Sequence, residues 1–260
     1  MRFGSYSFDR VEFAGSLGDL GTLVPLSVAL IAINGLNATA VFLMVGLFYI
    51  VAGAYYKLPI PVQPLKVVAA IAIASKLDAA TIAASGYLMG IVLIFIGVTG
   101  IVDTLARFFT KPIVRGIQLG LGLILINKAV AFIEKDELFI NGTPSYLGAV
   151  SVNTLVGVIG ALIVLVLLTS RRLPAAIAVL VFGLAVGILT GALSGVNFSP
   201  GYEPLHLMMP NSAILLNALV LLVIPQIPLT IGNAVMGTCD AANTLFGRTK
   251  ASKSTVRALS

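Results

Sequence analysis

Three prolines within a span of six residues interrupt apolar sequence that is otherwise suited to membrane helices. The segment reads Leu58-Pro-Ile-Pro-Val-Gln-Pro-Leu-Lys-Val-Val-Ala-Ala-Ile-Ala-Ile-Ala-Ser75. Because proline lacks a backbone donor and disfavours a helical residue before it, Pro59, Pro61 and Pro64 forbid a helix through the first part. From Leu65 onward nothing forbids one. We therefore expect this segment to enter a bilayer extended and to become helical partway across.

A helix that begins inside the membrane has an unusual polar end. Its first N–H groups lack intrahelical partners, and its positive dipole end points into the protein. In lipid, broken backbone of this kind persists only where it is buried in protein or lines a cavity. Transporters hold anionic groups at such helix ends. The segment therefore predicts an anion site.

The composition places the chain in a membrane. It is 58% hydrophobic and 10% charged, whereas a soluble domain carries about 25% charged residues. The net charge of +6 reflects basic loops and does not predict nucleic-acid binding. The single cysteine, Cys239, excludes an internal disulfide. The chain is thus expected to be an all-α multi-pass membrane protein.

Eight apolar segments are long enough to cross about 30 Å of hydrocarbon. Seven are continuous and the eighth is the broken segment, in which six extended and twelve helical residues together span roughly the required distance. The expected spans are 13–34, 38–56, 58–75, 80–100, 112–132, 152–170, 173–193 and 212–236.

The basic residues fix the expected orientation. With the N-terminus cytoplasmic and every span crossing once, twelve of the sixteen basic residues fall inside, as the positive-inside rule requires. They are Arg2, Arg10, Lys57, Arg107, Lys111, Arg115, Arg171, Arg172, Arg248, Lys250, Lys253 and Arg257. We therefore expect a multi-pass protein of the cell membrane.

A short internal repeat suggests two halves of opposite orientation. Residues 24–29 read Val-Pro-Leu-Ser-Val-Ala and residues 227–232 read Ile-Pro-Leu-Thr-Ile-Gly. Each lies in the opening span of its half, and seven spans separate them. The pattern is typical of the inverted repeats of secondary transporters.

Lys66 is the principal candidate binding residue. A lysine in the first turn of a buried helix is unfavourable toward the dipole and costly in hydrocarbon, and a bound anion would offset both. We expect Lys66, the preceding Gln63, Pro64 and Leu65, and free N–H groups near 65–67 to form the site. The alternative is a lysine that extends to the membrane surface or pairs with a carboxylate.

Asp19 is the candidate coupling residue. It lies within the first span, where a carboxylate is a functional candidate by default. It is expected to carry a proton, to balance the charge of Lys66, or to cap a helix that starts late. Thr22 nearby is a second candidate for binding, with bonding to its own helix as the alternative for Thr22 and for Ser27.

The last span carries a polar stripe. Gln226, Thr230 and Asn233 follow Pro225 at spacings that place them on one helix face. We expect this face to line the binding cavity, and the alternative is hydrogen bonding between helices. No metal-ligand cluster, catalytic pair or Walker motif occurs, so neither a cofactor nor an enzyme activity is expected.

Three motifs together resemble the molybdate transporter family, which is related to sulfate permeases. They are Gly15-Ser-Leu-Gly-Asp-Leu-Gly-Thr-Leu-Val-Pro-Leu26, Pro61-Val-Gln-Pro-Leu-Lys66 and Ile224-Pro-Gln-Ile-Pro-Leu-Thr-Ile-Gly-Asn233. The resemblance implies seven plus seven inverted spans arranged as a core and a gate. It also implies a tetrahedral oxyanion as substrate, molybdate first and sulfate second, held between two facing half-helices.

The resemblance also implies a division of the chain. Residues 1–100 would form part of the core, 101–193 part of the gate, 194–211 an outer loop and 212–260 the start of the second repeat. The second broken helix of the family does not occur in this sequence, so we expect a fragment of a longer transporter or an assembly of two chains, for example a homodimer.

Two alternatives to an oxyanion symporter stay open. The same fold would suit a nucleobase or a carboxylate as ligand. A non-transporting membrane scaffold or sensor built from half a transporter is the other alternative.

Overall fold

The computed structural model describes most of the chain in two compact units. The described residues are 2–3, 6–7, 20–56, 62, 64–101, 104–105, 108–137, 146–168, 170, 175–191, 201–205 and 208–232. The first unit comprises Met1–Val28 with Asn127–Tyr202, and the second comprises Ala29–Ile126 with Glu203–Ser260. Each unit is taken by itself below.

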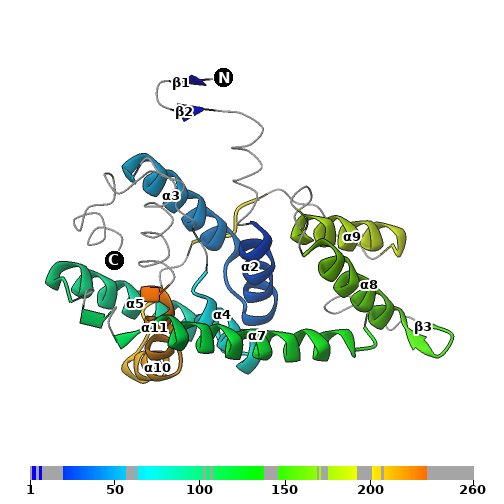
Figure 1. Ribbon diagram of the computed structural model, residues 1–260. Helices are drawn as coiled ribbons and strands as arrows, with labels where there is room; N and C mark the ends of the chain where they lie inside the picture. Colours follow the sequence, from blue (N-terminus) through cyan, green and yellow to red (C-terminus); the bar gives the residue numbers. More distant parts are fainter. Residues whose placement is uncertain are drawn as a thin grey trace. The chain divides into compact units, whose positions relative to one another are not determined.

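The structure is mostly helical, as the composition predicts (Figure 1). Within the described part of the chain, four helical stretches are long and apolar enough to cross a membrane: Ala38–Tyr55, Ala79–Thr99, Pro112–Ile133 and Ser212–Gly232. Four shorter apolar helices accompany them: Leu20–Asn34, Lys66–Ser75, Val152–Leu167 and Ile177–Leu189. Each of these stretches overlaps one of the eight predicted spans.

The elements have the following bounds. The helices are α2 (Leu20–Asn34), α3 (Ala38–Tyr56), α4 (Lys66–Ser75), α5 (Ala79–Thr99), α7 (Lys111–Ile133), α8 (Val152–Leu167), α9 (Ala175–Leu189), α10 (Ser212–Ala218), η1 (Leu219–Val223) and α11 (Ile224–Leu229). Two hairpins that the sequence did not predict pair β1 (Arg2–Phe3) with β2 (Tyr6–Ser7) and β3 (Tyr146–Leu147) with β4 (Val150–Ser151).

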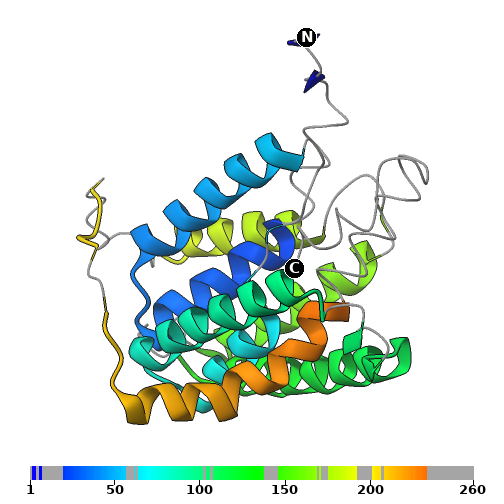
Figure 2. The same cartoon turned by 90° about the vertical axis from the view of Figure 1, so that its left-hand side faces the viewer.

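The eighth span is less regular than predicted. It consists of α10, the π-helical segment η1 and α11 in direct succession, and Figure 2 shows them as one rod. Pro225 and Pro228 lie in α11, where neither can donate a backbone hydrogen bond. A π-helical turn shifts the hydrogen-bond register, so a wider turn beside the prolines is the expected accommodation.

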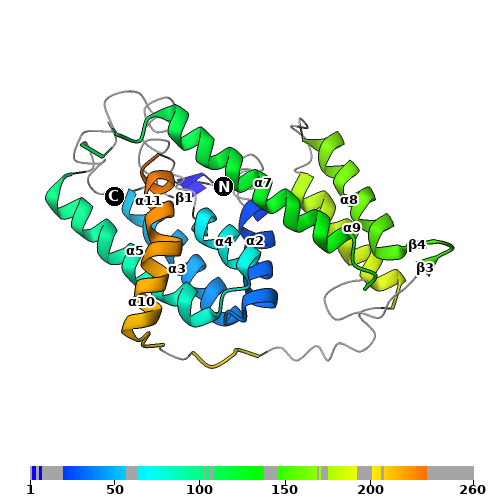
Figure 3. The ribbon, with the colours of Figure 1, turned by 90° about the horizontal axis from the view of Figure 1, so that it is seen from below.

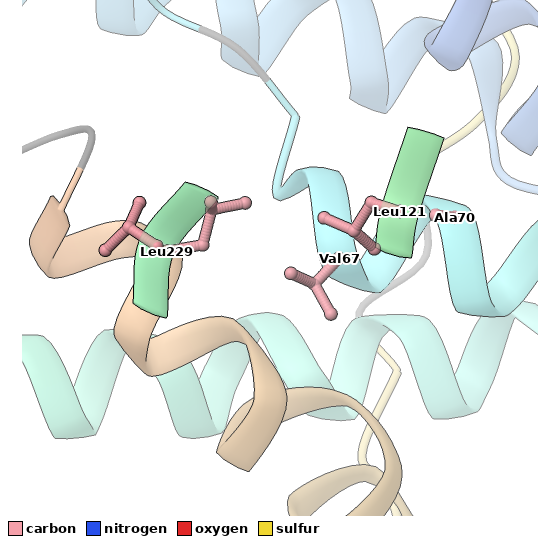
Figure 4. Packing of buried hydrophobic residues seen from close by; sticks show 5 residues of the cluster. Val67, Ala70, Leu121 and Leu229 are labelled. Atoms are coloured by element: carbon pink, nitrogen blue, oxygen red, sulfur yellow. The ribbon is translucent and has the colours of Figure 1, made fainter. Parts of the chain in front are cut away.

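The second unit is built around α4. This short helix packs against η1 and α11, while α5 packs against α10 and η1 (Figure 3). Val67 and Ala70 on α4 form one apolar cluster with Val114 and Leu121 on α7 and Leu229 on α11 (Figure 4). Helices that are far apart in the sequence thus converge on α4.

Loop residues of the second unit return to the start of α3. The Glu203 carboxylate accepts a hydrogen bond from the Ala38 N–H (2.9 Å), and the Glu203 N–H donates to Thr39 Oγ1 (2.8 Å). The Asn37 amide donates to the Pro204 carbonyl (2.9 Å). A carboxylate at a helix N-terminus is favourable toward the dipole, so these contacts fix the loop on α3.

In the first unit, α8 and α9 pack side by side (Figure 1). The Asn153 amide donates to the carbonyls of Phe132 (2.7 Å) and Lys135 (2.9 Å), which satisfies acceptors at the end of α7. In the loop between α7 and α8, a hydrogen bond to Asp136 raises the pKa of the Tyr146 hydroxyl.

Candidate functional site

The helical part of the broken segment is α4, and its sequence explains its boundaries. It begins at Lys66, after Pro64 and the extended residue Leu65 (φ −60°, ψ 100°). The sequence predicted a start at 64, and the extended conformation of Leu65 moves the first helical residue to Lys66. Leu65 supplies no side-chain cap. The helix ends at Ser75, followed by Lys76 in a left-handed conformation (φ 51°).

The interior of α4 is buried on all sides. Val67, Val68, Ala69, Ala70, Ala72 and Ile73 are each at most 5% exposed. A helix that is apolar all round lies in a protein core or spans a membrane, and the low exposure of α4 shows that protein covers it here. The small alanine side chains let neighbouring helices approach closely. The helical part of the broken segment, α4, therefore lies in the interior of its unit.

The N-terminus of α4 is capped from the eighth span. Gln226 Oε1 accepts hydrogen bonds from the Val67 N–H (2.9 Å) and the Val68 N–H (3.4 Å). Gln226 itself is 3% exposed. Because the first four N–H groups of a helix have no intrahelical partner, this side chain satisfies two of them from 159 positions away.

This cap corrects one sequence-based prediction. The N–H groups near 65–67 were expected to be free, but the Val67 N–H is bonded to Gln226. The physical reason is that a buried donor without an acceptor is costly, and the Gln226 amide lies within hydrogen-bonding distance of it. The polar stripe was expected to line a cavity, with hydrogen bonding between helices as the alternative. Gln226 makes the interhelical hydrogen bond.

Thr230 orients the capping side chain. The Gln226 Nε2 group donates to Thr230 Oγ1 (3.0 Å), and Thr230 is 8% exposed. A spacing of four residues places both side chains on one helix face, as predicted. The amide is thus held with its oxygen toward α4 and its nitrogen toward its own helix.

Two further side chains of the second unit hold the broken segment. The Tyr49 hydroxyl on α3 donates to the Val62 carbonyl (3.0 Å), in the chain that precedes α4. At the other end, Asn34 Nδ2 donates to the carbonyls of Ala72 (2.9 Å) and Leu77 (2.7 Å). The half-helix is therefore fixed before its start, at its N-terminus and at its C-terminus.

Sequence reasoning missed Asn34 and Tyr49. Both lie in expected spans, but nothing in the sequence indicates which carbonyl each would reach. One available signal was that Asn34 precedes Gly35 at the end of a span, which indicated only a helix end. A pairing across 38 positions depends on tertiary packing.

Lys66 adds charge at the same helix end. Its side chain is partly exposed, and within the part of the chain that the structure describes it forms no ion pair. The ammonium group and the positive end of the α4 dipole are carried by the same first turn. Both favour a negative charge there.

The remaining predicted site residues fall in different units or outside the described residues. Thr22 is partly buried in the first turn of α2 and belongs to the first unit, whereas Pro64, Leu65, Lys66, Gln226 and Thr230 belong to the second. Asp19, Gln63 and Asn233 lie outside the described residues. The Ser27 hydroxyl, expected to bond to its own helix, has no partner among the described groups although it is 1% exposed.

Metal chemistry is not indicated by the part of the chain described. Among those residues no group of three or more His, Cys, Asp or Glu side chains could hold a metal ion. The chemistry that the site offers is hydrogen-bond donation from a helix N-terminus together with one positive side chain. Such a combination is electrostatically favourable toward an anion.

Among the described residues, four apolar helical stretches long enough to cross a membrane, together with the buried helix α4, are features of a multi-pass membrane protein. The family model "Molybdate transporter of MFS superfamily" matches residues 11–125. The chain is thus similar in sequence to the molybdate transporter family, which confirms the predicted resemblance.

Curated relatives agree with this result. Molybdate transporter 2 of Arabidopsis thaliana is 26% identical over 271 residues, which cover 91% of this chain and 58% of the relative. Molybdate transporter 1 of the same plant is 35% identical over 49% of this chain and 29% of its own length. Molybdate transporter 1 of Chlamydomonas reinhardtii is 32% identical over 52% of this chain and 26% of its own length.

The chain spans little more than half of Molybdate transporter 2. It spans less than a third of each of the two Molybdate transporter 1 proteins. No solved structure matches the chain.

Proposed function

We propose that this chain is part of a secondary active transporter that moves a tetrahedral oxyanion across the cell membrane, with molybdate as the first substrate and sulfate as the second. The anion binds at the N-terminus of α4 near the bilayer midplane. Molybdate enters the proposal from the names of the relatives, and the anionic class from the residues at the helix end.

The observation that carries the proposal is the buried half-helix with Lys66 in its first turn. Its first four N–H groups point in one direction. The N-terminal end of the helix dipole and the Lys66 ammonium group are both positive. Hydrogen bonds from such donors to an ionised oxygen are shorter and about twice as strong as those to a neutral acceptor. An oxyanion is therefore favoured over a neutral nucleobase.

Several finer features belong to the same proposal. Gln63, Pro64, Leu65, Lys66 and Thr22 contribute from the first half of the chain. Gln226, Thr230 and Asn233 line the site from the eighth span, where Gln226 caps α4. Asp19 carries a coupling proton or balances the charge of Lys66. The core of two inverted repeats moves against the gate with the N-terminus cytoplasmic, and a homodimer would complete the assembly.

The experiment is a binding measurement on the purified full-length gene product. Calorimetry with molybdate is expected to show saturable binding, with sulfate competing and uracil not competing. Lys66→Ala is expected to weaken molybdate binding at least about tenfold, because hydrogen bonds and pairings with a charged group contribute about 1.5–3 kcal/mol.

Lys76→Ala is the matched control. Lys76 lies just past the opposite end of α4 and is exposed, so its loss changes the net charge equally without touching the N-terminal turn. Equal loss of binding in both variants would indicate a non-specific charge effect and contradict the site. Competition by uracil and none by sulfate would favour the nucleobase alternative.

A further inference from the structure

The cap on α4 has a property that the proposed site alone does not explain. The acceptor at Val67 and Val68 is a neutral carboxamide supplied from another helix, while the position before the helix, Leu65, supplies none. Serine, threonine, aspartate or asparagine at that position would have provided a permanent local cap. The two buried donors are instead satisfied by the side chain of a helix that is distant in the sequence.

The geometry of the two hydrogen bonds is unequal. The Val67 N–H lies 2.9 Å from Gln226 Oε1 and the Val68 N–H 3.4 Å. The second distance lies beyond the usual range of 2.7–3.2 Å for such bonds. One carboxamide oxygen thus serves two donors and serves the second one weakly. An anion with several oxygens would serve both donors at full strength.

A neutral cap also leaves the charge at the helix end unbalanced. Gln226 satisfies hydrogen bonds but does not offset the dipole or the ammonium group of Lys66. A neutral ligand that displaced the amide would exchange one neutral hydrogen bond for another and gain little. An oxyanion would exchange neutral bonds for charge-assisted ones and gain in each.

From these observations, and resting on the proposed function, we infer that Gln226 is the resident cap of the α4 N-terminus, which an incoming oxyanion displaces, and that this competition selects anions over neutral ligands. The Gln226 side chain acts as a positioning residue for α4 and not as a ligand of the anion. On displacement its oxygen leaves the Val67 and Val68 N–H groups. Its nitrogen keeps Thr230 as a partner on the same helix face.

The test compares three substitutions at this position in the full-length protein, with molybdate as the probe. Gln226→Met and Gln226→Ala remove the competing acceptor and are expected to bind molybdate about two- to tenfold more tightly, which matches the net strength of one neutral hydrogen bond. Gln226→Glu keeps the shape and adds a negative charge. It is expected to bind molybdate at least about tenfold more weakly.

Thermal unfolding with and without molybdate separates this role from a structural one. In Gln226→Met only the unliganded protein loses its cap, so the rise in Tm on adding molybdate is expected to exceed that of the unsubstituted protein. A side chain that merely supports the fold would lower both Tm values equally. Asn34→Ala, at the other end of α4, is the control in which the rise should be unchanged.

The outcomes are distinct. Absence of molybdate binding by the unsubstituted protein would overturn the proposed function itself. Normal binding by the unsubstituted protein with weaker binding by Gln226→Met and Gln226→Ala would show that Gln226 contacts the anion, and would overturn the inference alone. An unchanged Tm increment in Gln226→Met would also overturn it.

Discussion

At the scale of single residues, two buried carboxamides define the position of α4. Gln226 accepts from its first turn, and Asn34 donates to carbonyls at its last turn. Each amide therefore offers the group that the helix end lacks, since N-termini expose donors and C-termini expose acceptors. Neither contact adds a charge within the apolar interior, where a charge is costly.

Asn34 provides the first prediction. Its side chain is 6% exposed and donates to both Ala72 and Leu77. Asn34→Ala removes this donor, while the Ala72 carbonyl keeps the Leu77 N–H as a partner, so the variant is expected to destabilise the protein by about 0.5–1.5 kcal/mol. Asn34→Asp is expected to be worse, because a carboxylate cannot donate and lies at the negative end of the helix dipole. Thermal unfolding in detergent measures both.

The relative stability of Asn34→Ala and Asn34→Asp tests this prediction. If Asn34→Asp were as stable as the unsubstituted protein, the hydrogen bonds that Asn34 Nδ2 donates to the Ala72 and Leu77 carbonyls would contribute nothing to stability, and the prediction would fail.

At the scale of elements, the approach of helices depends on small residues. A Cβ atom at Gly232 would lie 2.5 Å from Val114 Cγ2 and 2.8 Å from Cγ1, and one at Gly157 would lie 2.5 Å from Ile133 Cγ1. Side chains do not tolerate such distances without movement. The end of the eighth span therefore approaches α7 only because residue 232 is glycine.

This contact gives a prediction with an internal rescue. Gly232→Ala is expected to destabilise the protein by about 1–3 kcal/mol through overpacking against Val114. Val114→Ala should restore most of that loss in the double variant, because it removes the two methyl groups that clash. Gly90→Ala on α5, where a Cβ meets nothing within 4 Å, is the control and should be nearly neutral.

The deciding measurement is whether the effects of Gly232→Ala and Val114→Ala on stability add in the double variant. Residues in contact show coupling energies in a double-mutant cycle, whereas distant ones add. Purely additive effects of Gly232→Ala and Val114→Ala on Tm would contradict the close approach.

The sequence predicts the location of the eighth span but not its hydrogen-bond register. Its apolar length predicted a helix over 212–236, and the helical residues 212–232 lie within that range. The π-helical turn at η1 was not predicted, because the hydrogen-bond register depends on how the prolines at 225 and 228 are accommodated. That register also determines which face carries Gln226.

At the scale of the whole molecule, the orientation in the membrane is the principal prediction from the basic residues. Twelve of sixteen are expected on the cytoplasmic side. In the predicted topology the broken segment crosses the membrane, so Lys76 lies on the outer side. The spans that follow place Ser170 on the cytoplasmic side. The two positions are exposed and accessible to a labelling reagent.

Cysteine labelling in intact cells tests this arrangement. In a background with Cys239→Ser, Lys76→Cys is expected to react with a membrane-impermeant maleimide from outside. Ser170→Cys is expected to react only after permeabilisation. Labelling of both from the same side would show that the intervening segments cross a different number of times, and would contradict the eight-span topology.

The division into core and gate stays a prediction at this scale, as does the seven-plus-seven inverted repeat. The two compact units of the structure are divided at other positions, after residues 28, 126 and 202. The matched region covers 58% of Molybdate transporter 2 of Arabidopsis thaliana, so the transport cycle belongs to the proposal.

The amino-acid sequence by itself determined the class of protein, the positions of the apolar helices and the break before Lys66. These depend on composition, on hydrophobic length and on the local chemistry of proline, which need no partner. It also indicated Lys66 and one face of the eighth span. Only the tertiary structure decided that Gln226 caps α4, that Asn34 holds its other end and that Tyr49 binds the chain before it. These contacts join residues up to 159 positions apart, and they exist only once the helices have packed.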